Sequence, residues 1–126
     1  MLLTEIKNVF NQRIPLDEFR KGVESEIVEY KKCLNKKDGS SPVYLNADMD
    51  YLLIKKEDVR FLCESFLNSN LDKWELNYLS EGLLLSDHVT FENPKVEDAF
   101  WAFTEVDFFK LVNQQYIRRV LEDLFD

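Results

Sequence analysis

The sequence predicts an all-α fold, a single domain over residues 1–126 built as a bundle of five or six helices. Three observations support this prediction. The chain contains only three glycines and three prolines, too few for the many tight turns of a β-sandwich or β-barrel. Hydrophobic residues form 45% of the chain and charged residues 32%, as expected for a globular core with a solvated surface. Apolar residues recur every three or four positions through most of the sequence, which is typical of amphipathic helices.

Two helices are expected in the first third of the chain. Residues 2–10 carry apolar side chains at helical spacing, and Ile14 and Pro15 end the pattern because a proline restricts the residue before it. A second helix is expected over residues 16–34, where five apolar residues step along one stripe: Phe19, Val23, Ile27, Tyr30 and Leu34. Residues 35–46 combine Gly, Ser and Pro and are expected to form the main loop.

The middle of the chain is expected to hold two more helices. Residues 47–54 suit either a helical turn or a short strand, and the sequence does not decide between them. A third helix is expected over residues 56–67. Asp72 and Glu75 match a capping box, in which each side chain accepts a hydrogen bond from the backbone of the other, so a fourth helix is expected to begin there. The short polar break before it indicates an antiparallel neighbour.

The last third is expected to contain two further helices. Asn93 and Pro94 match an N-cap followed by a first helical residue. The helix that follows is expected to bury Val96, Phe100 and Phe103. Residues 104–112 suit either helix or strand. A final helix is expected from four apolar positions: Ile117, Val120, Leu121 and Leu124.

The negative charge of the chain lies in its second half. Residues 1–56 hold ten basic and nine acidic side chains, whereas residues 57–126 hold six basic and fifteen acidic ones, and the whole chain carries −8. Such a field repels nucleic acid and anionic lipid, and it attracts a basic protein surface. The alternative is that these carboxylates only keep the protein soluble.

Catalysis has no positive support in the sequence. The only histidine, His88, is expected in a loop without a neighbouring nucleophile, and the two cysteines, Cys33 and Cys63, do not have the spacing of a zinc site. No phosphate-binding glycine motif occurs, and no carboxylate pair has the pattern of a calcium loop. We therefore expect no enzyme activity, no cofactor and no metal site.

The sequence also favours a cytoplasmic location. Its cysteines lack C-x-x-C spacing, and its first residues do not form a basic and apolar leader. No stretch approaches the roughly 20 apolar residues that cross a bilayer, so no membrane insertion is expected. The one basic cluster complements the dipole of a helix C-terminus, and direct binding of nucleic acid is not expected; it comprises Lys31, Lys32, Lys36 and Lys37.

An acidic and aromatic segment, residues 72–107, is the candidate binding surface. It holds nine acidic and two basic side chains together with six aromatic ones. Glu97 and Trp101 are four positions apart and share a helix face. Aromatic residues are enriched at binding hot spots, and carboxylates around one would select a basic partner; the alternative is that Trp101 completes the core. The expected partner-binding residues are Asp72, Glu75, Asp87, Glu92, Glu97, Asp98 and Trp101.

Three segments carry a resemblance to a known family. They are Ile-Pro-Leu-Asp-Glu-Phe at residues 14–19, LNSNLDKWELNYLSEGLLLSD at residues 67–87, and Val-Glu-Asp at residues 96–98 before a terminal helix. In this pattern of helices and apolar positions the chain resembles the small bacterial immunity proteins that neutralise colicin-D-like toxins and the toxins of contact-dependent growth inhibition. Residues 35–46 and 104–112 have no counterpart in that pattern.

The resemblance implies a helical protein that binds its cognate toxin in the producing cell. We expect the protein to be monomeric when free. Such proteins cover a basic active-site cleft, often that of a nuclease domain that cleaves RNA. The acidic second half agrees with this mechanism, because carboxylates can occupy the sites that substrate phosphates would take. Two alternatives remain: a helical adaptor or regulatory module that binds another cytosolic protein, and a metal-dependent enzyme that uses scattered carboxylates.

Overall fold

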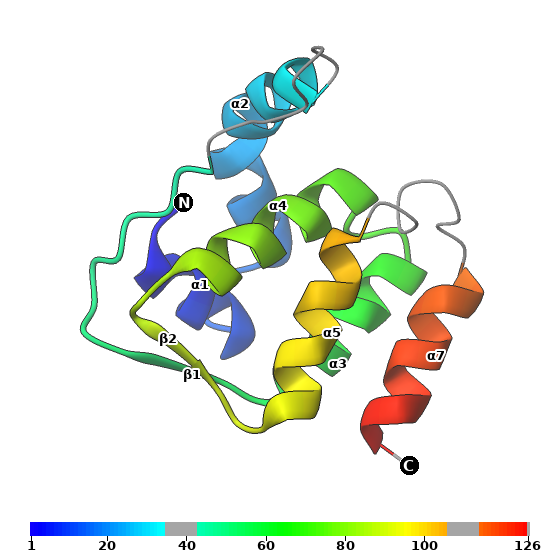
Figure 1. Cartoon of the computed structure of the whole chain (residues 1–126). Coiled ribbons are helices and arrows are strands. Elements are labelled where there is room, and N and C mark those ends of the chain that lie inside the picture. The colour runs from blue at the N-terminus through cyan, green and yellow to red at the C-terminus, as the bar shows by residue number, and fades with distance from the viewer. Residues whose placement is uncertain (35–42, 106–113, 126) are drawn as a thin grey trace.

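The computed structural model describes residues 1–34, 43–105 and 114–125 (Figure 1). Within this part of the chain six helices dominate, which confirms the prediction of a mostly α fold. In chain order the helices are α1 (Leu3–Phe10), α2 (Leu16–Leu34), α3 (Lys56–Leu67), α4 (Lys73–Leu85), α5 (Pro94–Thr104) and α7 (Gln114–Phe125). Two short strands are added to them, β1 (Leu52–Ile54) and β2 (Val89–Phe91).

The two strands form a small parallel sheet, a feature that the sequence did not predict for residues 89–91. Leu52 pairs with Val89. The Leu52 N–H donates to the His88 carbonyl oxygen, and the Glu92 N–H donates to the Ile54 carbonyl oxygen, both at 2.8 Å. The undecided segment 47–54 is therefore not helical and ends as a strand, because its backbone finds its partners on a distant part of the chain.

The polar side chains that begin α4 and α5 act as predicted. Asp72 accepts a hydrogen bond from the Glu75 N–H at 2.8 Å, and the Glu75 carboxylate accepts one from the Asp72 N–H at 2.8 Å, which completes the capping box. Asn93 accepts from the Val96 N–H at 3.1 Å, with Pro94 as the first helical residue of α5. Both helix starts are set by local chemistry, which explains why the sequence predicts them.

Left-handed residues close α1 and α3. Gln12 has a φ of 60° and Ser69 a φ of 62°, a conformation that glycine adopts more readily. After α1, the Gln12 N–H donates to the Val9 carbonyl at 3.0 Å and the next N–H donates to the Asn8 carbonyl at 2.8 Å. This is a Schellman motif, and Ser69 closes α3 with the same pair of bonds.

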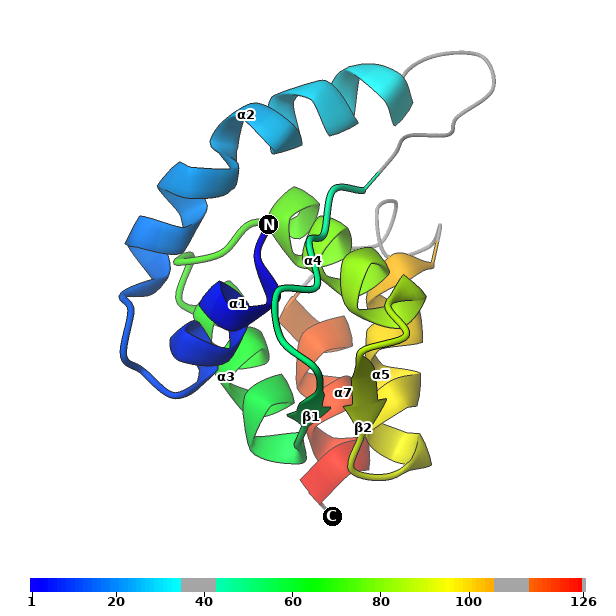
Figure 2. The same ribbon diagram turned by 90° about the vertical axis from the view of Figure 1, so that its left-hand side faces the viewer.

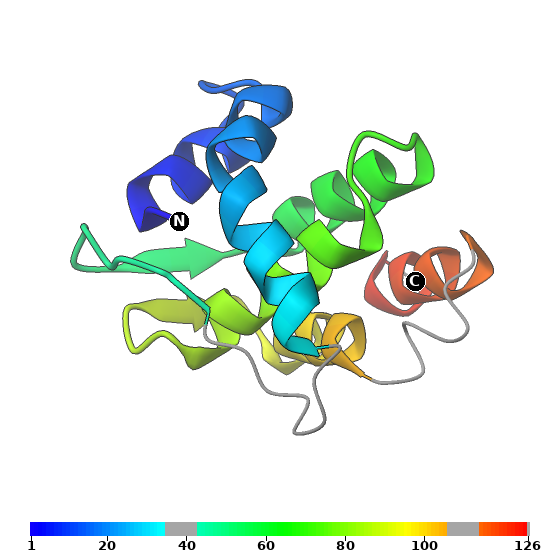
Figure 3. The same cartoon turned by 90° about the horizontal axis from the view of Figure 1, so that it is seen from above.

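A single cluster of buried apolar residues draws on all six described helices. Residues 75–80 of α4 are all buried, and this helix runs through the middle of the molecule between α2 and α5 (Figures 1 and 3). Residues 43–51 follow an extended path between α1 and α4 to reach β1 (Figure 2). Among the described residues, no helix has the length and apolar character required to cross a membrane.

The predicted core positions are largely confirmed. The apolar stripe of α2 is buried from Phe19 to Tyr30, as are all three predicted positions of α5. On α7, Ile117 is fully buried, and the other three predicted residues are partly buried against the core. Residues 35–42 of the predicted loop and residues 106–112 of the undecided segment lie outside the described residues.

Candidate partner-binding surface

Helix α5 divides its residues cleanly between the core and the solvent. Val96 and Phe100 are completely buried, which fixes the inner face of the helix. On the outer side, Glu97 and Asp98 are exposed, and the Trp101 side chain is 52% exposed. The interpretation that Trp101 completes the core is therefore wrong. We call Glu97, Asp98 and Trp101 the acidic face of α5.

Glu92 and Asp87 flank β2. Both residues are exposed, with Asp87 in the turn after α4 and Glu92 immediately before the N-cap of α5. The Glu92 carboxylate accepts a hydrogen bond from the Lys56 N–H at 3.0 Å, so its negative charge lies at the N-terminus of α3. An anion at this position is stabilised by the helix dipole. Glu92 therefore supports the fold and is also available at the surface.

Asp72 and Glu75 have structural roles at the start of α4. Glu75 is only 9% exposed, and its two carboxylate oxygens accept hydrogen bonds from the Arg20 Nε at 2.9 and 2.8 Å. The hydrogen bond to Glu75 raises the pKa of the Arg20 guanidinium. Asp72 is exposed, but its carboxylate caps the helix. Glu75 therefore joins α4 to α2 and does not face solvent.

The seven predicted residues do not gather into one patch. Asp72 and Asp87 lie beyond opposite ends of α4, and a helix of 13 residues is about 20 Å long. Only the acidic face of α5, with Glu92 just before it, is brought together by one rigid element. A partner that contacts α5 would meet these residues first.

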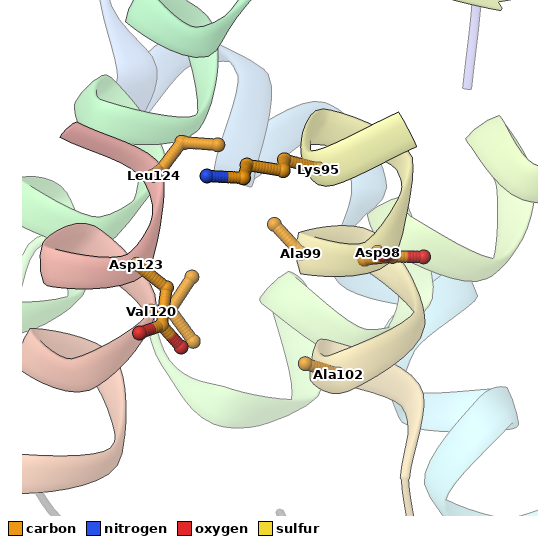
Figure 4. A pocket seen from close by; sticks show the side chains of 7 residues that line it. All are labelled: Lys95, Asp98, Ala99, Ala102, Val120, Asp123 and Leu124. Carbon is orange, nitrogen blue, oxygen red and sulfur yellow. The ribbon is translucent and has the colours of Figure 1, made fainter. Parts of the chain in front are cut away.

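A cleft that the sequence did not predict lies between α5 and α7, beside this acidic face. Its volume is about 360 Å³. The lining residues come from both helices (Figure 4): Lys95, Asp98, Ala99, Ala102, Val120, Asp123 and Leu124. The Tyr116 hydroxyl donates to the carbonyl oxygen of Ala102, a lining residue, at 3.2 Å and so links α7 to α5. The two alanines, three positions apart on α5, are the only sequence signal that indicates such a depression.

A buried polar network links α2, α4 and α5. The Tyr30 hydroxyl donates to the Asn77 side-chain oxygen, and it also lies 3.0 Å from the Glu81 carboxylate. The Asn77 amide donates to the Phe103 carbonyl at 2.9 Å. Burial raises the pKa of Glu81, and the hydrogen bond from Tyr30 opposes that rise. Burial likewise raises the pKa of Tyr30. The network positions three helices relative to one another.

Of the two residues considered for catalysis, His88 lies at the surface and Cys63 lies in the core. His88 is exposed, and its Nδ1 lies 3.1 Å from the Asp50 carbonyl oxygen. Cys63 is completely buried, and burial raises the pKa of its thiol to about 12, which makes it a poor nucleophile. In residues 1–34, 43–105 and 114–125, no three His, Cys, Asp or Glu side chains are grouped to hold a metal ion.

Comparison of the chain with protein-family models, with curated protein sequences and with solved structures finds no match.

Proposed function

We propose that this protein is an immunity protein: a cytoplasmic, non-enzymatic inhibitor, monomeric when free, that binds a cognate bacterial toxin through an acidic surface. The toxin would be a basic nuclease domain. The observation that carries the proposal is the acidic face of α5, where two exposed carboxylates stand beside a half-exposed tryptophan. Large exposed aromatics with surrounding charge are typical of binding hot spots.

Electrostatics would supply both encounter and inhibition. The second half of the chain holds fifteen acidic and six basic side chains, so its field attracts a basic surface and speeds association. At contact, the carboxylates of Glu97 and Asp98 would take the places of substrate phosphates in the nuclease cleft. The toxin would then be blocked without any reaction on the part of the inhibitor.

The rigidity of α5 favours tight binding. Its inner face is fixed by Phe100 and Phe103, whose rings pack edge to face with centroids 5.9 Å apart. A helix held in this way presents Trp101 with little backbone entropy left to lose on association. Glu92, which is exposed just before the N-cap of α5, would extend the negative surface along this helix.

The first test is to identify the partner. The tagged protein is co-purified from cells that carry its chromosomal neighbourhood, and the retained proteins are identified at low and at high salt. We expect a basic nuclease domain encoded beside this chain, released as the salt concentration rises, because salt screens attraction between exposed charges. Retention of a housekeeping protein, or of no protein, would refute the immunity function.

An adaptor that binds another cytosolic protein is the second candidate. It is favoured by apolar side chains that lie at the surface, of which Leu85 is 75% exposed and Tyr51 56% exposed. Contact through these residues would bury apolar area and would be insensitive to salt. A partner that stays bound at high salt and is released when Leu85 and Tyr51 are replaced by Ser would support this function instead.

A further inference from the structure

We infer that the cleft between α5 and α7 is an anchor pocket for one cationic side chain, an arginine, of the basic partner. The inference rests on the proposed function and specifies how its surface recognises that partner. It is drawn from the shape of the cleft, the state of its charges and its position beside the acidic face of α5.

The shape of the cleft suits a long side chain with an apolar stem. Ala99 and Ala102 line the α5 wall, and Val120 and Leu124 line the α7 wall. The hydrogen bond from the Tyr116 hydroxyl to the Ala102 carbonyl oxygen holds the two helices together. Arginine buries its methylene groups along apolar surface while its charged head remains at the rim, so stem and head would each meet suitable groups.

The charges at the rim are not used by the fold. Two carboxylates and one amine line the cleft, and none of them takes part in the ion pairs found among the described residues. Asp123 stands on the α7 wall beside Val120, and the Lys95 amine reaches across from α5 toward Leu124 (Figure 4). Since the Asp98 carboxylate points along the outer side of α5, the charges left at the cleft itself are Asp123 and the Lys95 amine, and the Asp123 carboxylate can bind a guanidinium.

Asp98 connects the cleft to the acidic face of α5. It lines the cleft, and its carboxylate points along the outer side of α5 (Figure 4). Trp101 follows three positions later and lies on the neighbouring part of the helix surface. A partner centred on Trp101 would thus have the cleft within reach of one adjacent side chain. Asp123 would contact the cation, and Asp98 would add to the negative field.

The test uses a defined peptide and does not require the partner. The isotope-labelled protein is titrated with acetyl-Gly-Arg-Gly-amide, and the methyl resonances of Ala99, Ala102 and Val120 are followed by NMR. The matched control peptide replaces arginine by citrulline, which has the same shape without the charge. We expect saturable shifts with the arginine peptide and affinity for the citrulline peptide weaker by about threefold or more.

Protein variants separate the cleft from the general negative field. Asp123→Asn should weaken the affinity for the arginine peptide by about threefold. Glu122→Gln removes the same charge from an exposed neighbouring position and should leave this affinity unchanged. Ala102→Leu should fill the cleft and abolish the shifts. If Ala102→Leu does not fold, Asp123→Asn still tests the inference, because it preserves the shape of the cleft. Equal binding of the two peptides, equal effects of the two charge variants, or no saturable shift would overturn the inference.

Failure of the anchor pocket and failure of the immunity function give different results. If the co-purification retains no basic protein while the arginine peptide binds as expected, the immunity function fails and the cleft keeps its specificity. If a basic nuclease domain is retained but the peptide does not bind, the function stands and the anchor pocket does not.

Discussion

At the residue scale, Glu75 illustrates how a carboxylate in an acidic segment can serve the fold. From the sequence, Glu75 was expected to be an exposed partner-binding residue. Its ion pair with Arg20 could not be predicted, because it depends on the packing of α4 against α2 and leaves no local sequence pattern. Its capping-box role, which is local, was predicted correctly. The sequence therefore could not predict that a distant helix buries one of the candidate surface residues.

Replacing Glu75 by Gln should destabilise the protein without impairing partner binding. The change removes a nearly buried charge and leaves Arg20 without its carboxylate; since Arg20 is partly exposed, we expect a loss of about 1–2 kcal/mol in the free energy of unfolding. Urea denaturation measures the loss, and co-purification checks retention of the partner. A variant of unchanged stability would contradict the role assigned to this ion pair.

The burial of Glu81 predicts that the stability of the protein depends on pH. Burial raises its pKa in the folded state, so the protonated form fits the fold better, and its contribution to stability is present at low pH and lost as the pH rises through the raised pKa. Glu81→Gln mimics the protonated form beside Tyr30. We expect it to increase stability at pH 7 by about 0.5–1 kcal/mol.

The gain from Glu81→Gln should shrink as the pH falls below the ordinary range of a glutamate, because wild-type Glu81 is then protonated too. Urea midpoints of the wild type and the variant, measured in parallel at pH 7 and pH 4, report the difference. A variant that is less stable at both pH values would show that the charged carboxylate is preferred in the network.

At the scale of elements, helix ends account for most of what the sequence predicts. Capping side chains lie within three residues of the groups they satisfy, so the starts of α4 and α5 are visible locally. The β1–β2 pair is not visible, because three residues of alternating exposure make a weak signal and their hydrogen-bond partners lie far along the chain. The α5–α7 cleft depends on how α7 packs against α3 and was likewise unpredictable.

The left-handed ends of α1 and α3 offer a test at this scale. Gln12→Gly and Ser69→Gly should each stabilise the protein by about 0.5–1 kcal/mol, because glycine adopts a positive φ without the cost that a side chain imposes. Glu64→Gly, at an exposed helical position, is the control and should destabilise the protein by about 1 kcal/mol. Thermal unfolding of the three variants measures the effects, and destabilisation by Gln12→Gly would contradict the account of the cap.

At the scale of the whole molecule, charge and shape are separable. The acidic second half of the chain sets the long-range field, whereas contact requires a rigid, exposed and partly apolar element, and among the described helices α5 combines these features. The sequence predicted the charge and the face of α5 because both follow from composition and helical period. It could not predict that the seven acidic and aromatic candidates lie on different sides of the molecule.

The measurement that tests the central claim most directly is charge reversal on α5. The double variant Glu97→Lys/Asp98→Lys is compared with Glu18→Lys/Glu29→Lys, which makes the same change in net charge at exposed positions of α2. Both tagged proteins are incubated with the nuclease domain recovered by co-purification, and retention at low salt is measured. We predict that the α2 variant retains the domain and that the α5 variant loses it; equal retention by both would show that the acidic face of α5 is not the binding surface.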